Sequence, residues 1–492
     1  MTTDAEPDLR LQAVRDLLQH ARWHEALVRA RALVEQDARN PQAWVFLGEA
    51  LEHLGRKHEA WLAYERAWVL DPPAEWVDAA KQRLFPLAPA PAADWLTAAL
   101  RVPVVRVAAA LIVRNEARLL ADVLAAVQPA VDEIVVVDTG SNDATPDIAR
   151  NAGARVFSYA WQDDFSAARN FALAQVQADW VLWVDGDEVL DPEDVGVPRL
   201  AAGLFDGLGE PVILRIVQVN KLGTRVEPNY DMSRMHPTRY GIRWWGRVHE
   251  QLGPPAGGVY ARAYLRPVVR IRLHHDGYDA QTRGDKTKIH RNISLLRRSV
   301  EEDPHDVASW GFLGRELLLA GDVDAAIDAL ERAEQLAAGQ PLYARVPEVR
   351  MYLGEALLMR QRLDEALAVA ERAVAHHPDF PASWFLLGRV QLAQAVQLLH
   401  QAHRSFGQAQ ATALGYRGIV SVDSQIAQWG AAAGQADALK LLGDWVRARA
   451  LYEDLLARHP ELDPVRRQLR HMDEQITALR PDPPRTPEPA PM

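Results

Sequence analysis

The chain has 492 residues, of which 48% are hydrophobic and 25% are charged, and its formal net charge is −11. This length exceeds one ordinary domain, and the composition is that of a globular protein with ample apolar core. The negative charge argues against nucleic acids and acidic membrane surfaces as partners, because those anions attract basic proteins.

Cysteine is absent from the chain, so neither a disulfide nor a thiolate metal site can form. The N-terminus lacks a basic segment followed by an apolar stretch, and no apolar run approaches the length of a membrane span. We therefore expect no signal peptide, no transmembrane segment and a cytoplasmic location.

The first 85 residues carry an internal repeat. Residues 40–72 have the spacing of a tetratricopeptide repeat, a pair of antiparallel helices, and residues 9–38 form a weaker copy. The matching residues of the clearer copy are Trp44, Leu47, Gly48, Ala60, Tyr64, Ala67 and Pro72. Small residues let the two helices cross closely, and each pair needs a neighbour to bury its remaining apolar face. We predict an all-α repeat domain over residues 1–85 and a proline-rich linker over 86–104.

Residues 105–282 follow a different pattern, in which short apolar runs alternate with helical stretches. The predicted strands are residues 107–113, 132–138, 155–161 and 179–184, and the predicted helices between them are 118–127, 145–153 and 165–176. Such alternation is typical of an α/β domain whose mostly parallel sheet is covered on both faces.

Polar clusters directly follow three of these strands: Asn115 and Glu116, then Asp138 to Asp143, then Asp185 to Glu188. In a parallel sheet the strands' carboxyl ends share one edge, where ligands bind. Asp138 precedes a glycine turn and is suited to holding a ribose or a base edge. Asp143 has the alternative role of a turn or helix cap.

Asp185 and Asp187 are separated only by a glycine, behind an apolar strand that does not call for unpaired carboxylates. Their spacing suits a hard divalent cation that also binds the phosphates of a nucleotide. Mg²⁺ fits such oxygen ligands, and Mn²⁺ accepts a histidine in addition.

The C-terminal part returns to the repeat pattern. We predict a connecting helix over residues 283–303, repeats over 304–478 and a disordered proline-rich tail over 479–492. The segment that starts at Trp384 loses the repeat register, because His400 stands where alanine is expected. An irregular or lengthened helix pair is predicted there.

Residues 106 to about 298 resemble the family 2 glycosyltransferases with the GT-A fold, in the branch fused to tetratricopeptide repeats. The S-glycosyltransferases of glycocin peptides belong to the same broad group. The blocks "LIVRNEA", "DEIVVVDTGSNDAT", "DDFSAARNFAL", "DWVLWVDGDE", "GRVHEQL", "HHDGY" and "KIHRNISLLRR" occur in the family's order. The fold class that this implies is a Rossmann-like α/β GT-A domain, flanked by all-α repeat domains.

The resemblance also implies roles at matching positions. The residues that would hold the uridine of a sugar nucleotide are Val113, Asn115, Glu116 and Asp138. Asp185 would contact the ribose or the sugar and is also a candidate metal ligand, whereas Asp187 would bind the metal on the diphosphate. His275 is the candidate for a further metal ligand, with His274 the weaker choice and a turn or core histidine the alternative.

Arg169 and Asn170 lie on the helix before the last of these strands. The arginine could pair with the diphosphate or orient Asp185, the alternative being an ordinary surface salt bridge. Arg234, fifteen residues before His249, occupies a position where this branch usually has an arginine, although its neighbourhood departs from the family pattern.

Glu250 is the candidate general base, because inverting transfer needs a carboxylate that takes the acceptor's proton. The alternative is that Glu250 only supports its loop. Trp244 and Trp245 would provide a dry wall, and Trp245 could stack on a sugar. His249 is interpreted instead as a residue that orients the loop.

The function that follows is a metal-dependent, inverting transfer of a sugar, with Mn²⁺ or Mg²⁺ as cofactor and a UDP-sugar as donor. The acceptor would be a hydroxyl or thiol of a protein or peptide, since stacked repeats form concave binding surfaces. Repeats also mediate dimerisation, so a homo-oligomer is a second expectation. Two alternatives stay open: a decayed catalytic domain that acts as a binding module, and transfer to a polysaccharide or lipid carrier.

Overall fold

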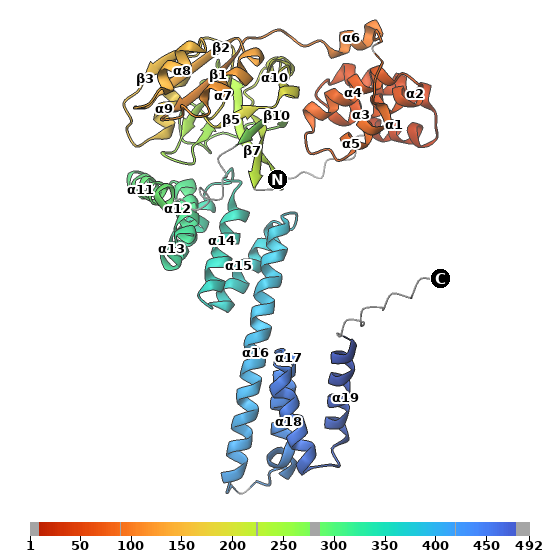
Figure 1. Cartoon of the computed structure of the whole chain (residues 1–492), viewed down its shortest axis with the longest axis vertical. Coiled ribbons are helices and arrows are strands. Elements are labelled where there is room, and N and C mark those ends of the chain that lie inside the picture. Colours follow the sequence, from red (N-terminus) through yellow and green to blue (C-terminus); the bar gives the residue numbers. More distant parts are fainter. Residues whose placement is uncertain (1–8, 89, 223–224, 276–285, 419, 479–492) are drawn as a thin grey trace, which may run out of the picture. The chain divides into compact units, whose positions relative to one another are not determined.

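The computed structural model describes residues 9–88, 90–222, 225–275, 286–418 and 420–478. The chain packs as two compact units, Met1–Val346 and Pro347–Met492 (Figure 1). Packing therefore divides the second repeat block after its first helix pair. The predicted disordered tail, 479–492, lies outside the described residues.

The N-terminal repeats form five helices: α1 (Leu9–Gln19), α2 (Trp23–Gln36), α3 (Pro41–His53), α4 (Lys57–Leu70) and α5 (Trp76–Leu84). All the residues that match the repeat pattern except Pro72 are buried, and Trp44, Leu47 and Ala60 are fully so. A Cβ atom added at Gly48 would lie 2.6 Å from the Tyr64 ring, so glycine lets α3 and α4 approach this closely.

The predicted linker contains a short helix, α6 (Asp94–Leu100), and is attached to α4. Arg66 Nη2 donates a hydrogen bond to the Leu100 carbonyl at 2.7 Å, and the Ala93 amide donates to Glu59 Oε1 at 2.8 Å. Side chains of α4 thus fix the position of the linker.

The α/β domain contains an eight-stranded sheet with the order β3-β2-β1-β4-β7-β6-β10-β5 and a two-stranded sheet, β8-β9. Strands β1 to β4 are parallel, as the strand–helix alternation predicts, whereas β7 and β5 run antiparallel to their neighbours. The strand bounds are β1 Val107–Val113, β2 Glu133–Asp138, β3 Arg155–Ser158, β4 Trp180–Trp183, β5 Glu188–Leu190, β6 Leu214–Leu222, β7 Arg225–Pro237, β8 Arg243–Trp245, β9 Gln251–Gly253 and β10 Val268–His275.

Both faces of the large sheet are covered. Alternate residues of β1 point to opposite faces, so Leu111 joins one core with α7, α8 and α10, while Ala110 joins a second core with α9 and the β8-β9 hairpin. The helix and 3-10 turn bounds are α7 Leu120–Val127, η1 Gln128–Ala130, α8 Thr145–Asn151, α9 Phe165–Leu173, η2 Pro192–Asp194 and α10 Val197–Asp206. This burial on two sides explains why the strands read as continuous apolar runs.

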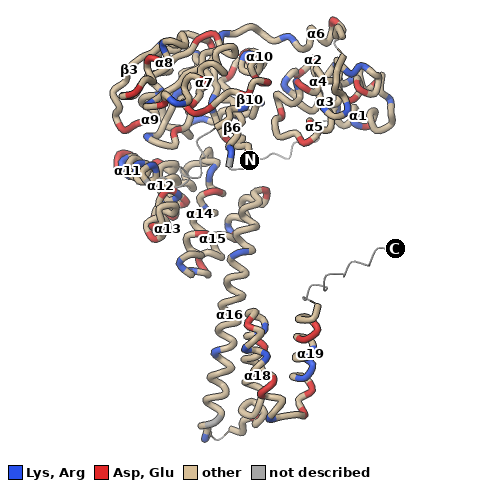
Figure 2. The backbone as a smooth tube through the Cα atoms, in the orientation of Figure 1, with Lys and Arg blue, Asp and Glu red and all other residues tan. Residues whose placement is uncertain are grey.

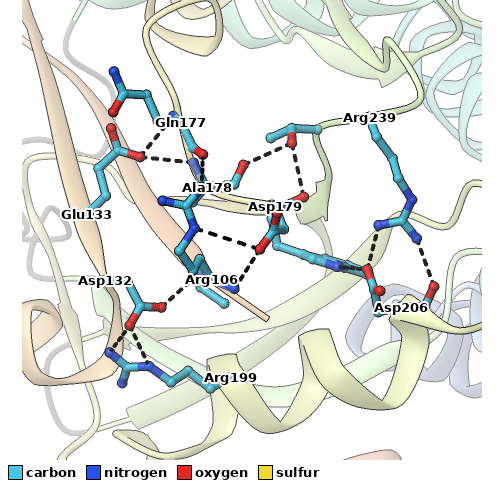
Figure 3. Close-up of polar contacts among 12 residues, drawn as sticks. Arg106, Asp132, Glu133, Gln177, Ala178, Asp179, Arg199, Asp206 and Arg239 are labelled. Atoms are coloured by element: carbon cyan, nitrogen blue, oxygen red, sulfur yellow. Dashed lines mark hydrogen bonds and ion pairs between the residues drawn. The ribbon is translucent and has the colours of Figure 1, made fainter. Parts of the chain in front are cut away.

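At the amino ends of β1 and β4, charged side chains satisfy one another and nearby backbone groups (Figure 3). The Arg106 amide donates to Asp179 at 2.9 Å, and Glu133 accepts from the amide of Ala178 at 3.1 Å. Arg239 and the Trp180 indole both donate to Asp206. These pairs connect the amino ends of the strands to the helices and loops around them. The contacts at this edge of the sheet therefore stabilise the fold.

Three further helices belong to the first unit: α11 (Lys286–Glu302), α12 (Val307–Ala320) and α13 (Val323–Ala337). The first of them is the predicted connecting helix. Helices α12 and α13 form a repeat pair. A Cβ atom added at Gly314 of α12 would lie 2.4 Å from Leu330 Cγ of α13, so these helices cross as closely as those of the N-terminal repeats.

The second unit is helical. Its elements are α14 Val346–Met359, α15 Leu363–His376, α16 Pro381–Gly415, the π-helical turn η3 Ile426–Gly430, α17 Ala431–Leu441, α18 Trp445–Arg458 and α19 Asp463–Ala478. Acidic and basic side chains are interspersed along these helices (Figure 2), and Arg449, for example, bonds both Glu453 and Asp473. No helix in the described part of the chain is both long and apolar enough to span a bilayer.

The lengthened region predicted after Trp384 is a single 35-residue helix, α16. Gly388 stands where the repeat pattern places its crossing glycine, yet a Cβ atom added there would meet nothing within 4 Å. The repeat signature therefore continues through the first helix of a pair, and the chain then extends that helix instead of turning back.

Candidate active site

Three strand ends bring the predicted polar clusters to one edge of the large sheet. Strand β1 lies between β2 and β4 and is parallel to both, and Val113 pairs in register with Asp138. The Asn115 amide donates to Ser141 Oγ at 2.9 Å, and the Asn142 amide donates to Asn115 Oδ1 at 2.9 Å. The loops after β1 and β2 are thus joined to each other.

Glu116 connects the first cluster with the third. Its amide donates to Thr145 Oγ1 at 2.8 Å, and a Cβ atom added at Gly186 would lie 2.8 Å from Glu116 Cγ. Burial raises the pKa of Glu116, and the nearby Asp187 carboxylate adds to the increase. The glycine between the two aspartates therefore leaves just enough room for this glutamate.

The acids of the second cluster differ in what they bond. Asp138 is buried, and its carboxylate accepts from the amides of Gly140 and Ser141 in its own turn. Asp143 accepts from the Thr145 amide at 2.9 Å and from the Ala117 amide at 3.3 Å. Asp143 thus stabilises the turn before α8, whose N-cap is Ala144, while donor binding by Asp138 stays a prediction.

Asp185 is held by two buried arginines. Arg169 Nη2 donates to Asp185 Oδ1 at 2.8 Å, and Arg234 donates to both carboxylate oxygens. Burial would raise the pKa of Asp185, but Arg234 and Arg169 outweigh it and hold the pKa well below its usual range. Both oxygens of this carboxylate therefore serve the arginines, which leaves Asp187 as the aspartate directed elsewhere.

The role of Arg234 was not predicted from the residues around it. It reaches Asp185 because β7 pairs antiparallel with β4, with Met235 opposite Leu182. The single signal in the sequence was its distance from His249, and the departure of its neighbours from the family pattern obscured that signal.

Glu188 supports the turn that carries the two aspartates. Its side chain is completely buried, and it accepts from the Asp185 amide at 2.9 Å and from Gln218 Nε2 at 2.6 Å. Burial raises the pKa of Glu188, and the Asp185 charge raises it further. This glutamate thus stabilises the turn through its hydrogen bond with the Asp185 amide.

Asp187 and His275 form a pair. His275 Nε2 lies 3.2 Å from Asp187 Oδ2, and its Nδ1 lies 3.2 Å from Asn220 Oδ1. The hydrogen bond to Asp187 raises the pKa of His275. His274, the weaker candidate, instead contacts Asp191 at 2.8 Å and connects β10 to the residue that directly follows β5. The last three residues of "HHDGY", 276–278, lie outside the described residues.

One carboxylate and one imidazole are a donor set that fits Mn²⁺ better than Mg²⁺, which prefers oxygen alone. Within the described ranges of the chain, no group of three or more acidic or histidine side chains is arranged to hold a metal ion. Asp187 and His275 would therefore supply two protein ligands, and water or phosphate oxygens would have to supply the others.

Arg169 joins Asp185 to Glu250. Its Nε donates to Glu250 Oε1 at 2.7 Å, and its guanidinium lies 4.8 Å from the Trp244 ring and 5.4 Å from the Trp183 ring. The side chain of Arg169 is 5% exposed, so its ion pairs are buried and are not the ordinary surface salt bridge that was the alternative prediction. The buried guanidinium thus pairs with the half-buried carboxylates of Asp185 and Glu250, and such charge-assisted hydrogen bonds are stronger than those between neutral groups.

The two tryptophans of β8 have different surroundings. Trp244 is buried edge-on against Trp183 and forms the wall beneath Arg169. Trp245 is partly exposed, and its Nε1 donates to the Pro254 carbonyl at 2.9 Å. Asn170 bonds both the amide and the carbonyl of Trp244 at 2.9 Å, so this residue positions β8.

Comparison with known families assigns the segments of the chain. Residues 109–249 match the model of glycosyl transferase family 2. Tetratricopeptide repeat models match four further stretches: residues 11–75, 283–341, 347–390 and 434–461. The predicted combination of family and repeats is thus confirmed.

Two curated relatives share this pattern in part. A TPR repeat-containing protein of Synechococcus elongatus is 33% identical over 271 residues, which is 54% of this chain and 64% of that protein. The SPbeta prophage-derived glycosyltransferase SunS of Bacillus subtilis is 26% identical over 225 residues, which is 45% of this chain and 52% of that protein. The chain therefore spans between about half and two thirds of the length of these relatives.

Solved structures overlap the chain only loosely. Residues 1–349 of S. aureus TarS are 14% identical, with 56% of this chain and 92% of that chain covered and a TM-score of 0.33. A glucosyl-3-phosphoglycerate synthase from Mycobacterium tuberculosis is 27% identical, with 23% and 44% covered and a TM-score of 0.21. Neither superposes closely enough to transfer any detail of its site.

Proposed function

We propose that this chain, in which a family 2 glycosyltransferase domain lies between tetratricopeptide repeats, transfers a sugar from a nucleotide-sugar donor to an acceptor. The observation that carries the proposal is the match of residues 109–249 to that family together with acids at one edge of its sheet. A decayed domain used as a binding module is disfavoured, because Asp138, Asp185, Asp187, Glu250 and His275 are all retained.

The donor we propose is a UDP-sugar, bound across the ends of β1, β2 and β4. Val113, Asn115, Glu116 and Asp138 would receive the nucleoside, and Asp187 with His275 would hold Mn²⁺ at the diphosphate. When bound, the metal supplies electrostatic stabilisation of the charge that develops on the departing diphosphate. Asp185, fixed by Arg169 and Arg234, would present a permanently ionised carboxylate to the ribose or sugar.

For the transfer itself we propose inversion, with Glu250 as the base. The acceptor's oxygen or sulfur would form a bond to the anomeric carbon as the bond to the diphosphate breaks, and Glu250 would take the acceptor's proton. Support comes from its connection through Arg169 to Asp185, which fixes the base relative to the donor acid. Arg169 thus holds the carboxylates of Glu250 and Asp185 at a fixed separation.

The acceptor we propose is a protein or peptide held by the repeats. A cavity of about 560 Å³ lies among α11, α12 and α13, with an apolar floor that includes Val300, Leu313 and Leu317 and a charged rim that includes Arg297 and Asp328. An extended peptide with apolar and charged side chains would suit this lining. Transfer to a polysaccharide or a lipid carrier remains the competing acceptor class.

Association of copies through the repeats is a further proposal. Helix α16 exposes several large apolar side chains that a partner copy could cover: Trp384, Phe385, Leu392 and Leu398. Light scattering coupled to size exclusion would report the mass, and a strictly monomeric chain at high concentration would refute this part of the proposal.

The test of the function is nucleotide release. The protein is incubated with Mn²⁺ and a panel of UDP-sugars, and slow release of UDP is measured. We expect Asp187→Ala to lose release by about 100-fold or more, because one of only two protein ligands of the metal is removed. The matched control is Asp147→Asn, an exposed acid on α8 whose carboxylate bonds Arg150. Equal release by wild type and Asp187→Ala, or none from wild type with any donor, would refute the proposal.

Glu250→Gln separates a base from a loop support. A variant that lacks the base should bind UDP-sugar as wild type does and lose turnover with the acceptor. Loss of donor binding in Glu250→Gln would instead assign the residue to support of the site.

A further inference from the structure

The segment Gly246–Glu250, which we call the base loop, has a backbone that needs external support. Gly246 has φ of +96°, and His249 has φ of +52°, a left-handed conformation that costs a residue with a side chain free energy. Such a conformation persists only when its surroundings hold it. The base loop carries Glu250 at its end, so the backbone position of Glu250 depends on what holds His249, while Arg169 bonds the Glu250 carboxylate directly.

Repeat-side helix α11 holds the start of the base loop. Arg247 donates from Nη2 and Nε to the two carboxylate oxygens of Glu302, at 2.7 and 2.9 Å. The same guanidinium donates to the Asp163 carbonyl at 3.2 Å, and the Arg247 carbonyl accepts from the Phe165 amide at 2.9 Å. The loop is thus tied to α11 and to the start of α9, which also carries Arg169.

Helix α12, the first helix of the second repeat block, holds the end of the base loop. His249 Nε2 lies 2.9 Å from Glu316 Oε1, and the imidazole ring packs on Phe312 with a centroid distance of 4.8 Å. Arg315 Nη2 lies 3.0 Å from both His249 Nε2 and Glu316 Oε1. The three residues of α12 therefore surround the imidazole.

Glu316 is suited to act as a fixed anion in this contact. Its side chain is 5% exposed. Burial would raise the pKa of Glu316, but hydrogen bonds from His249 and Arg315 outweigh burial and lower it. Glu316 is the one acid on α12. Burying a carboxylate costs desolvation free energy unless charged and hydrogen-bonding partners compensate for it, and here His249 and Arg315 are those partners.

We propose that Glu316 is a positioning residue for the transfer reaction: through His249 it fixes the base loop and so sets the place of Glu250 opposite the donor. This inference rests on the proposed function. It makes the first repeat helix of the second block a part of the catalytic architecture as well as a lining of the peptide cavity, since Leu313 and Leu317 of the same helix lie in that cavity.

The test uses the full chain with Glu316→Gln and Glu316→Leu. The matched control is Glu59→Gln, which alters an equally buried glutamate of repeat helix α4 that accepts from Arg56 and from the Ala93 amide, away from the base loop. Three quantities are measured: kcat and KM for UDP-sugar with acceptor or water, and hydrogen exchange of the peptide that contains residues 246–250.

We expect Glu316→Leu to lower kcat by about 10- to 100-fold with KM for the donor unchanged, because a displacement of about 1 Å at the reacting groups costs this much. Exchange in the base loop should accelerate in Glu316→Leu, and Glu316→Gln, which keeps an acceptor oxygen, should be intermediate. Glu59→Gln should change neither kcat nor exchange in the loop.

Unchanged exchange of the base loop in Glu316→Leu would overturn the inference whatever the activity. Accelerated exchange with unchanged kcat would overturn it as well, because the loop would then be loosened without consequence. If Glu316→Leu fails to fold, Glu316→Gln decides by the same two readouts. A wild type that releases no UDP refutes the proposed function, while the exchange experiment still decides whether Glu316 holds the loop.

Discussion

Two buried arginines organise the site at the scale of single residues. Arg169 and Arg234 contact Asp185 from two elements that are distant in sequence, and Arg169 also contacts Glu250. The Asp185 carboxylate is only partly exposed, and its two cationic partners favour its ionised form, whereas loss of either arginine would weaken that stabilisation. The site is therefore pre-organised before any donor binds, because its acids are oriented by the chain itself.

His236, on β7, gives a prediction about pH. Its Nε2 lies 3.2 Å from Trp183 Nε1 and its Nδ1 lies 3.1 Å from the Pro237 carbonyl, which suits a neutral ring that accepts at Nε2 and donates at Nδ1. Burial lowers the pKa of His236 to about 4. Between pH 6.5 and 4 the unfolded chain binds a proton at this ring that the folded chain does not, so the folded state loses stability as the pH falls.

The expected loss from His236 over that range is about 3 kcal/mol of unfolding free energy. Melting temperatures measured from pH 7 to pH 4 should therefore fall less steeply for His236→Gln than for wild type, although the variant starts from a lower value. Parallel curves for the two proteins would show that His236 does not contribute to acid sensitivity.

At the scale of elements, the repeats depend on glycines that let helices cross closely. A Cβ atom added at Gly314 would lie less than 3 Å from Leu330 of its partner helix α13, and one added at Gly354 would lie less than 3 Å from Leu386 of α16. Gly388 in α16 instead faces open space. The same sequence signature thus serves two situations. Packing distinguishes them, because the glycine is necessary only where a neighbouring helix packs closely on it.

Alanine substitutions at these glycines should have opposite effects. Gly388→Ala removes a poor helix former from an exposed position and should stabilise the second unit by up to about 1 kcal/mol. Gly314→Ala would press on Leu330 and should destabilise the first unit by about 1–3 kcal/mol. Thermal unfolding followed by circular dichroism measures both. Destabilisation by Gly388→Ala would mean that α16 has a partner at this position.

At the scale of the whole molecule, repeats and catalytic domain share the unit Met1–Val346. Arg270 of β10 lies 3.9 Å from the Trp68 ring of α4 and contacts Glu65 and the buried Asp194. On the C-terminal side, α11 and α12 hold the base loop. Within this unit, the repeat helix α4 and the helices α11 and α12 are therefore packed against the catalytic domain.

Truncation should distinguish a packed boundary from a linker. A chain that ends after Val346 should fold and retain UDP release, because the compact unit is complete. A chain that ends after Asp303 lacks α12 and should lose about tenfold or more in turnover through the freed base loop. Circular dichroism and UDP release give the comparison. Equal turnover of the two fragments would place the functional boundary before α12.

Much of the fold could be predicted because its signals are local. Strand–helix alternation from Val107 to Trp183 and repeat spacing around Trp44 depend on residues a few positions apart, and the structure has the expected elements there. The meeting of the acids at one edge also followed, since parallel strands share a carboxyl edge. The extent of α16 did not follow, because a helix ends or continues according to what packs on it.

The sequence by itself determined the classes of element, the order of the domains and the acids available at the strand ends. Only the tertiary structure decided which of these acids are already paired: Asp185 with Arg169 and Arg234, and Glu250 with Arg169. It also decided that a repeat helix would hold His249, through a contact between residues 67 positions apart. Periodicity is a property of neighbouring residues, whereas charge pairing depends on which distant segments the packing of the core brings together.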